Sequence, residues 1–136
     1  MSLSNVFNLS GSALHAQNVR LNTIALNIAN ADSIAGSPET TFRAQIPVFR
    51  AVFDEQQGSQ GVGVRVVGIV EDTTAPRKQY MPENPMADDD GFIYMPNINA
   101  VEQMSNMMSA SRSFQVNIEM MNTAKELMMR TLTIGQ

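Results

Sequence analysis

Apolar residues recur at seven-residue intervals near both ends of this chain, and this spacing limits what the chain can fold into. The N-terminal series is Phe7, Leu14, Leu21 and Ile28. The C-terminal series is Met107, Phe114, Met121 and Met128. A seven-residue repeat keeps its apolar side chains on one face of an α-helix, as in coiled coils. The sequence therefore predicts long helices over residues 4–31 and 98–134.

Neither helix is expected to stand alone. The first contains Gly11 and six asparagines, all of which are poor helix formers. The second has neither glycine nor proline and runs well past the length of an ordinary globular helix, which is typical of a coiled coil. We expect the two apolar stripes to pair. The pairing is either within the chain alone or, as we favour, within the chain and onto other chains as well.

The middle of the chain has the composition of strands and loops. Val62–Val70 is rich in β-branched residues and predicts a strand. Residues 42–53 form an extended stretch that Pro47 interrupts, and the glycines within 56–63 predict a turn. Residues 73–97 carry four prolines and predict an irregular connection to the second helix. We expect a small β unit of two to four strands.

These patterns predict an α+β fold, with long N- and C-terminal helices pairing as a coiled coil around a small β-rich, loop-containing middle. The three expected segments are 1–34, 35–97 and 98–136. Charge follows a similar division, because residues 1–31 carry +1, residues 32–97 carry -5 and residues 98–136 are neutral. Near-neutral helices can pack against identical neighbours without like-charge repulsion.

Composition excludes most kinds of chemistry. The chain has no cysteine and one histidine, His15, which removes thiolate sites, most zinc sites and most Ser-His-Asp triads. The acidic run Asp88–Asp90 precedes Gly91, but neither glycine nor glutamate falls where an EF-hand calcium loop needs it. We interpret this run as an acidic turn, and His15 as a solvent-facing or interface residue. We therefore predict no catalytic residue, no cofactor and no metal site.

The net charge of -4 argues against nucleic acid as a partner, because nucleic-acid binding needs a basic surface. No apolar run reaches the length of a membrane-spanning helix. The first base is Arg20, so the start of the chain lacks the basic region of a secretory signal peptide. We predict neither a membrane span nor a cleaved signal.

Two passages resemble the bacterial flagellar rod and hook protein family. The string Asn27-Ile28-Ala29-Asn30 ends the first predicted helix, and a passage rich in proline leads into the second. The residues that carry this resemblance are Asn27, Ala29, Asn30, Asn84, Pro85, Pro96 and Asn97. The likeness covers nearly the whole chain, although Ile28 stands where leucine is usual and residues 35–60 match loosely.

The resemblance implies a structural subunit of the proximal rod of the flagellar basal body, which assembles helically and transmits torque from the motor to the distal rod and hook. It implies a periplasmic rod location and export by the flagellar type III system. Its implied partners are copies of itself, other proximal and distal rod proteins, the rod-base adaptor protein and the export apparatus. The two heptad series are then the expected assembly interface, where we expect a charged residue at Leu21 or Phe114 to block assembly.

Two alternatives stay open at this point. A helix-pairing adaptor or export chaperone would need helices that are stable in the isolated monomer, whereas a rod subunit would gain them on assembly. A small hydrolase that uses Asp88–Asp90 would need a nucleophile or a set of metal ligands, and the sequence offers neither.

Overall fold

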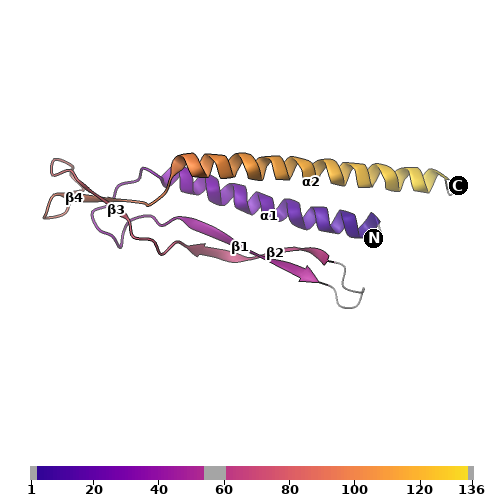
Figure 1. Ribbon diagram of the computed structural model, residues 1–136, viewed down its shortest axis with the longest axis horizontal. Helices are drawn as coiled ribbons and strands as arrows, with labels where there is room; N and C mark the ends of the chain where they lie inside the picture. Colours follow the sequence, from indigo (N-terminus) through magenta and orange to yellow (C-terminus); the bar gives the residue numbers. More distant parts are fainter. Residues whose placement is uncertain (1–2, 54–60, 135–136) are drawn as a thin grey trace. The chain divides into compact units, whose positions relative to one another are not determined.

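The computed structural model of the 136-residue chain describes residues 3–53 and 61–134. Its elements, in chain order, are α1 (Leu3–Asn30), β1 (Gln45–Phe53), β2 (Gly61–Glu71), β3 (Arg77–Tyr80), β4 (Phe92–Met95) and α2 (Ala100–Ile134) (Figure 1). The predicted α+β class, with a long helix at each end and a small β-rich middle, is confirmed. Most of the glycine-rich turn predicted over 56–63 lies outside the described residues.

The strands form two separate two-stranded sheets, β1 with β2 and β3 with β4. The predicted break at Pro47 is wrong, because β1 continues through it. Each strand of a two-stranded sheet has a free edge, where a proline costs no ladder hydrogen bond. The irregular connection predicted over 73–97 is also wrong, because β3 and β4 pair antiparallel within it, with Tyr80 opposite Phe92. The prolines of that stretch lie outside both strands.

Contacts between residues divide the chain into two compact units. Unit 1 consists of Met1–Leu21, Pro47–Gly68 and Met108–Gln136. Unit 2 consists of Asn22–Ile46 and Ile69–Met107. Each unit draws on both terminal helices and on the middle of the chain, and the division into segments 1–34, 35–97 and 98–136 stays a prediction.

In unit 1, the first part of α1 lies beside the second part of α2, and the two helices run in opposite directions (Figure 1). A Cβ built on Gly11 would lie 3.8 Å from Cε of Met121. The most buried residues of these segments are small, and they are Ser10, Ala16, Ala110 and Ala124. Small side chains allow two helices to approach closely, although pairing as a coiled coil stays a prediction.

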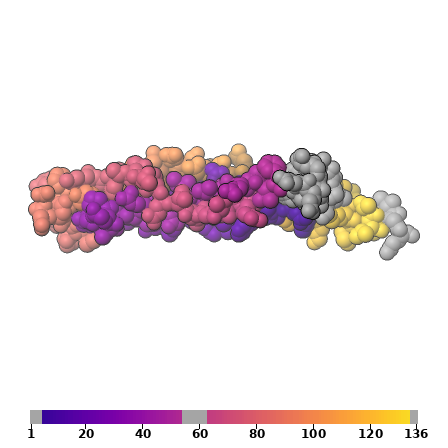
Figure 2. Space-filling model, turned by 90° about the horizontal axis from the view of Figure 1, so that it is seen from below, coloured from indigo at the N-terminus to yellow at the C-terminus, as the bar shows by residue number. Residues whose placement is uncertain are grey.

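The β1–β2 sheet packs on the other part of the α1 surface in unit 1. The Val64 amide donates a hydrogen bond of 3.1 Å to Oγ of Ser12, and that hydroxyl donates one of 2.8 Å to the Leu9 carbonyl. Viewed from the side of this sheet, the atoms of β1 and β2 lie in front with no helix over them (Figure 2). Several large apolar side chains of these strands are exposed, and they include Phe49, Phe53 and Val67.

Unit 2 has its own core around the β3–β4 hairpin. Ile93 of β4 and the following Pro96 are the largest fully buried side chains of the described chain. Ala35 exchanges backbone hydrogen bonds of 2.9 Å with Tyr94, and the Arg77 guanidinium donates to the Pro96 carbonyl at 3.1 Å. The first pair of bonds holds β4 against the segment that follows α1, and the bond from Arg77 ties β3 to the residue after β4.

Helix α2 begins with a side-chain cap. Oδ1 of Asn99 accepts hydrogen bonds from the amides of Val101 at 3.1 Å and Glu102 at 3.3 Å. An asparagine at this position satisfies amides that have no partner within the helix. None of the described helices combines the length and the apolar character that a bilayer crossing requires.

Candidate assembly interface

The eight residues of the predicted stripes lie between core and surface. Phe7 is 39% exposed, and the other seven are half-buried. Those seven are Leu14, Leu21, Ile28, Met107, Phe114, Met121 and Met128. Packing within one chain therefore leaves part of each side chain accessible.

Small and polar residues of α1 are more deeply buried than its predicted stripe. Ser10, Ala16, Thr23, Ile24 and Asn27 are each at most 5% exposed. Ala16 and Thr23 are seven residues apart, and so are the half-buried Gln17 and the buried Ile24. A heptad search restricted to large apolar residues misses this face. Weighting alanine, serine and threonine equally with leucine would have found it.

Each adjacent methionine pair in α2 has one half-buried and one exposed member. Seven of the eleven methionines lie in α2, and six of these form the pairs Met107–Met108, Met120–Met121 and Met128–Met129. In each pair one methionine is half-buried, namely Met107, Met121 and Met128. Its neighbour, Met108, Met120 or Met129, is exposed, with Met108 reaching 72%. The predicted stripe is thus the inner member of each pair.

The exposed apolar residues of α2 continue along most of its length. They are Val101, Met104, Met108, Val116, Ile118, Met120, Leu127, Met129 and Leu132. Single exposed apolar residues are normal on a protein surface, but a sustained series marks an interaction site. Methionine suits such a surface, because its flexible thioether adapts to different neighbours. In unit 1, several of these residues line a shallow cavity of about 370 Å³ beside Val6.

The Asn27-Ile28-Ala29-Asn30 string fastens the end of α1 to the start of β1. The side-chain amide of Asn27 donates to the Gln45 carbonyl at 2.9 Å, and its Oδ1 accepts from the Gln45 amide at 2.8 Å. Asn27 is 3% exposed, so both bonds are protected from water. Asn30 donates to the Leu26 carbonyl at 2.8 Å where the helix ends, and Ala29 is exposed.

The proline-rich string forms the connection between β3 and β4. Oδ1 of Asn84 accepts a hydrogen bond of 2.9 Å from the Met86 backbone amide. The backbone amide of Asn84 donates to the Met81 carbonyl at 3.1 Å. Pro85 is exposed in this turn, Pro96 is fully buried after β4, and Asn97 is exposed. These motif residues belong to two places in unit 2, a turn and a core.

Asp88 closes the acidic turn. Its Oδ1 accepts from the Phe92 amide at 2.8 Å and the Asp90 amide at 3.1 Å, while the Tyr94 hydroxyl donates to Oδ2 at 3.0 Å. The bond from Phe92, aided by those from Tyr94 and Asp90, keeps the pKa of Asp88 below its usual 3.8 despite partial desolvation. Gly91 has φ +80°, which favours glycine there. The prediction of an acidic turn is confirmed.

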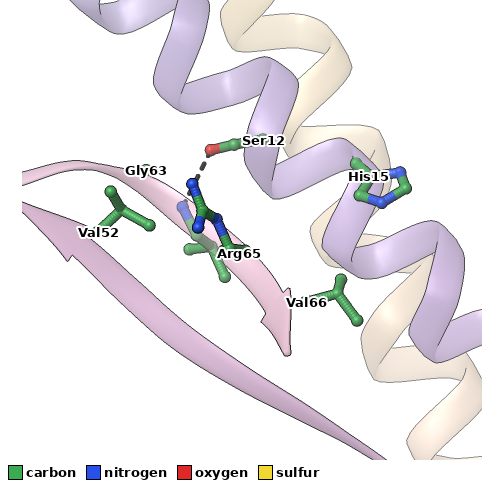
Figure 3. A pocket seen from close by; sticks show the side chains of 7 residues that line it. Ser12, His15, Val52, Gly63, Arg65 and Val66 are labelled. Atoms are coloured by element: carbon green, nitrogen blue, oxygen red, sulfur yellow. Dashed lines mark hydrogen bonds between the residues drawn. The ribbon is translucent and has the colours of Figure 1, made fainter. Parts of the chain in front are cut away.

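No cluster of three histidine, aspartate or glutamate side chains suited to a metal ion occurs within 3–53 and 61–134. His15 is exposed on α1 and lines a cavity next to β2 (Figure 3). The arrangement as a whole offers surfaces for packing, built from apolar side chains and fixed turns.

Comparison with known proteins agrees with this interpretation. Residues 7–34 match the family model "Flagella basal body rod protein", and residues 89–134 match "Flagellar basal body rod FlgEFG protein C-terminal". The chain is 47% identical to the flagellar basal-body rod protein FlgC of Yersinia enterocolitica over 136 residues, the full length of both chains. It is 46% identical to FlgC of Salmonella typhimurium, again over the full length of both. FlgC of Buchnera aphidicola from Acyrthosiphon pisum is 41% identical over 138 aligned residues.

The first match covers most of α1 with the Asn27–Asn30 string, and the second runs from Asp89 through β4 and α2. With full-length identity of this size, the chain belongs to the FlgC family of flagellar basal-body rod proteins.

Proposed function

We propose that this structural subunit of the flagellar basal-body rod lies in the proximal rod, where it assembles helically and transmits torque from the motor to the distal rod and hook. Membership of the FlgC family supports the assignment to the rod. A head-to-tail contact that does not close on itself generates a helical assembly, which is the geometry a rod requires.

The observation that carries the assembly role is the exposed apolar surface of α2. Met108, Val101 and Leu132 are 72%, 75% and 68% exposed. Burying one such side chain fully is worth about 1.5–3 kcal/mol, so even a few of them would contribute substantially to a contact between subunits. A free-standing enzyme of this size gains nothing from exposing them.

We propose two roles for the residues of the stripes. The half-buried members, Phe7, Leu14, Leu21, Ile28, Met107, Phe114, Met121 and Met128, contribute to packing within the chain and complete it against neighbours. The outward members of the methionine pairs contact other subunits. The motif residues Asn27, Ala29, Asn30, Asn84, Pro85, Pro96 and Asn97 hold the shape of the end of α1 and of the β3–β4 region.

The proposed partners are copies of the chain, other rod proteins, the rod-base adaptor protein and the flagellar export apparatus. We place the subunit in the periplasmic part of the basal body, exported by the flagellar type III system without a cleaved signal. We also infer that it catalyses no reaction and binds neither nucleic acid nor membrane. Family membership and the net charge of -4 support these inferences.

Complementation of a motile bacterium that lacks its own FlgC tests the proposal. The wild-type chain should restore swimming and appear in isolated basal bodies. Met108→Asp should be exported but absent from basal bodies, because an exposed carboxylate would be buried at the subunit contact. Ala75→Asp adds the same charge at an exposed residue between β2 and β3 and should assemble normally. Normal rods built from Met108→Asp would contradict the assigned surface.

A further inference from the structure

The two compact units carry opposite net charges. Unit 1 has six basic and four acidic residues, giving +2, whereas unit 2 has three basic and nine acidic residues, giving -6. The net charges of the two units add up to the -4 of the whole chain. When two copies approach, unit 2 of each repels unit 2 of the other and attracts unit 1. Charge therefore favours contacts between unit 1 of one copy and unit 2 of the other.

Unit 1 contains a cavity suited to an acidic side chain. Its volume is about 330 Å³, and Ser12, His15, Val52, Gly63, Val64, Arg65 and Val66 line it (Figure 3). The valines make its wall apolar, while Arg65 of β2 and His15 of α1 contribute the side chains that can donate to an anion. Oγ of Ser12 already accepts from Val64 and donates to Leu9.

Arg65 is available for an external partner. Its side chain is exposed, and no described residue forms an ion pair or a hydrogen bond with its guanidinium. A guanidinium binds a carboxylate through two parallel hydrogen bonds, a geometry that fixes orientation as well as charge.

Unit 2 presents matching carboxylates on a fixed turn. Asp88 is committed within the turn, because it accepts hydrogen bonds from Phe92, Asp90 and Tyr94. Asp89 and Asp90 are exposed, and neither carboxylate bonds to any residue within 3–53 and 61–134. The turn therefore presents two exposed carboxylates on a backbone that Asp88 already orders, which lowers the ordering cost of binding.

We propose that the Arg65–His15 cavity of one copy receives the Asp89–Asp90 turn of a second copy. This inference rests on the proposed function as a rod subunit and specifies one contact by which copies follow one another. Each copy carries the cavity in unit 1 and the turn in unit 2, so a copy that receives one turn still offers its own turn to the next copy.

Disulfide trapping tests the contact directly, because the chain has no cysteine of its own. His15→Cys and Asp89→Cys, combined in one chain, leave Arg65 and Asp90 to make the ion pair. Oxidised basal bodies should then yield covalent dimers and higher multimers on a non-reducing gel. Each single variant should stay monomeric, as should His15→Cys combined with Glu39→Cys, which places the cysteine at another exposed acid of unit 2.

A charge exchange provides the second test. Arg65→Asp alone, and Asp89→Arg with Asp90→Arg, should each lower the yield of basal bodies at least tenfold. All three changes together should restore at least half of the wild-type yield. Rods that contain the double-cysteine protein but give no multimers would overturn the inference, as would a triple variant no better than either parent. If the wild-type chain is absent from basal bodies altogether, the proposed function itself fails.

Discussion

Asn27 acts as a substitute for a neighbouring strand. Its side-chain amide exchanges two hydrogen bonds with the backbone of Gln45, in the way that paired residues of a sheet exchange theirs. The pair joins residues 18 positions apart and sets where β1 starts relative to the end of α1. A side chain that substitutes for backbone in this way tolerates no change of length or of donor and acceptor pattern.

Asn27→Ala should lower the free energy of unfolding by about 2 kcal/mol, because it leaves the amide and carbonyl of Gln45 without partners. Asn8→Ala is the matched control, since Asn8 is an exposed asparagine of the same helix. That change should be neutral or slightly stabilising, as alanine is the better helix former. Equal effects of the two substitutions in thermal unfolding would contradict the role given to Asn27.

The lowered pKa of Asp88 makes the hairpin sensitive to acid. A carboxylate whose pKa is lower in the folded chain than in the unfolded one stabilises the fold fully above the usual value of 3.8. That contribution is lost as the pH falls through the lowered pKa. Asp88→Asn should therefore reduce the melting temperature at neutral pH, and its deficit relative to wild type should shrink on acidification. Asp89→Asn removes a carboxylate that bonds to no residue within 3–53 and 61–134, so it should leave the melting temperature at neutral pH unchanged. A constant Asp88→Asn deficit from neutral to acid pH would contradict the role given to Asp88.

At the scale of elements, the contact between β2 and α1 depends on the absence of a side chain. A Cβ on Gly63 would lie 2.8 Å from Oγ of Ser12 and 3.3 Å from its Cβ. No real side chain accepts the first distance, so Ser12 would have to move and release the Val64 amide. Gly63 therefore allows β2 to approach α1 closely enough for the β1–β2 sheet to pack on the helix.

Gly63→Ala should accelerate hydrogen exchange at the Val64 amide at least tenfold, because the bond to Ser12 breaks. Gly68→Ala is the control within the same strand, since a Cβ there meets nothing within 4 Å. Its exchange at Val64 should match that of wild type. If both variants behave alike, the packing of the sheet on α1 does not depend on this approach.

A charge introduced at the half-buried member of a methionine pair in α2 should have a different effect from the same charge at the exposed member. Met121→Asp places a carboxylate on the half-buried face near Gly11 and should reduce the helix content of the isolated chain. Met120→Asp, one residue away on the exposed face, should leave that content unchanged and block assembly instead. Circular dichroism and basal-body yield separate the two effects. Loss of helix in both variants, or in neither, would show that the pair does not divide between two faces.

The sequence predicts helices better than strands in this chain, for a physical reason. Seven-residue repeats persist over many turns, one from Phe7 to Ile28 and one from Met107 to Met128. The ends of both helices are therefore predictable to within a few residues. The β3–β4 hairpin has strands of only four residues among prolines, and its stability comes from Asp88, Ile93 and Pro96 brought together by the fold. The burial of Ser10 and Thr23 likewise depends on tertiary packing. The seven-residue repeat of large apolar residues includes neither of those two.

At the scale of the whole molecule, the core is small for the helices it supports. The two helices comprise 28 and 35 residues, yet the buried residues of unit 1 are mainly alanine and serine. Small side chains bury little apolar area, and long helices are marginal without a packed face. The isolated chain should therefore contain less helix than the 63 residues of α1 and α2 together. If circular dichroism of the monomer shows all 63 residues as helix, a stable adaptor is favoured over a subunit that folds on assembly.

In the rod, neighbouring subunits should cover the exposed apolar residues of α2. A single cysteine introduced at Met108 tests this most directly, since it would be the only thiol in the chain. The measurement is the rate at which a bulky thiol reagent labels that cysteine in intact basal bodies and after their dissociation. Labelling of the cysteine should be at least tenfold slower in intact basal bodies than after their dissociation. Equal rates in the two states would contradict it.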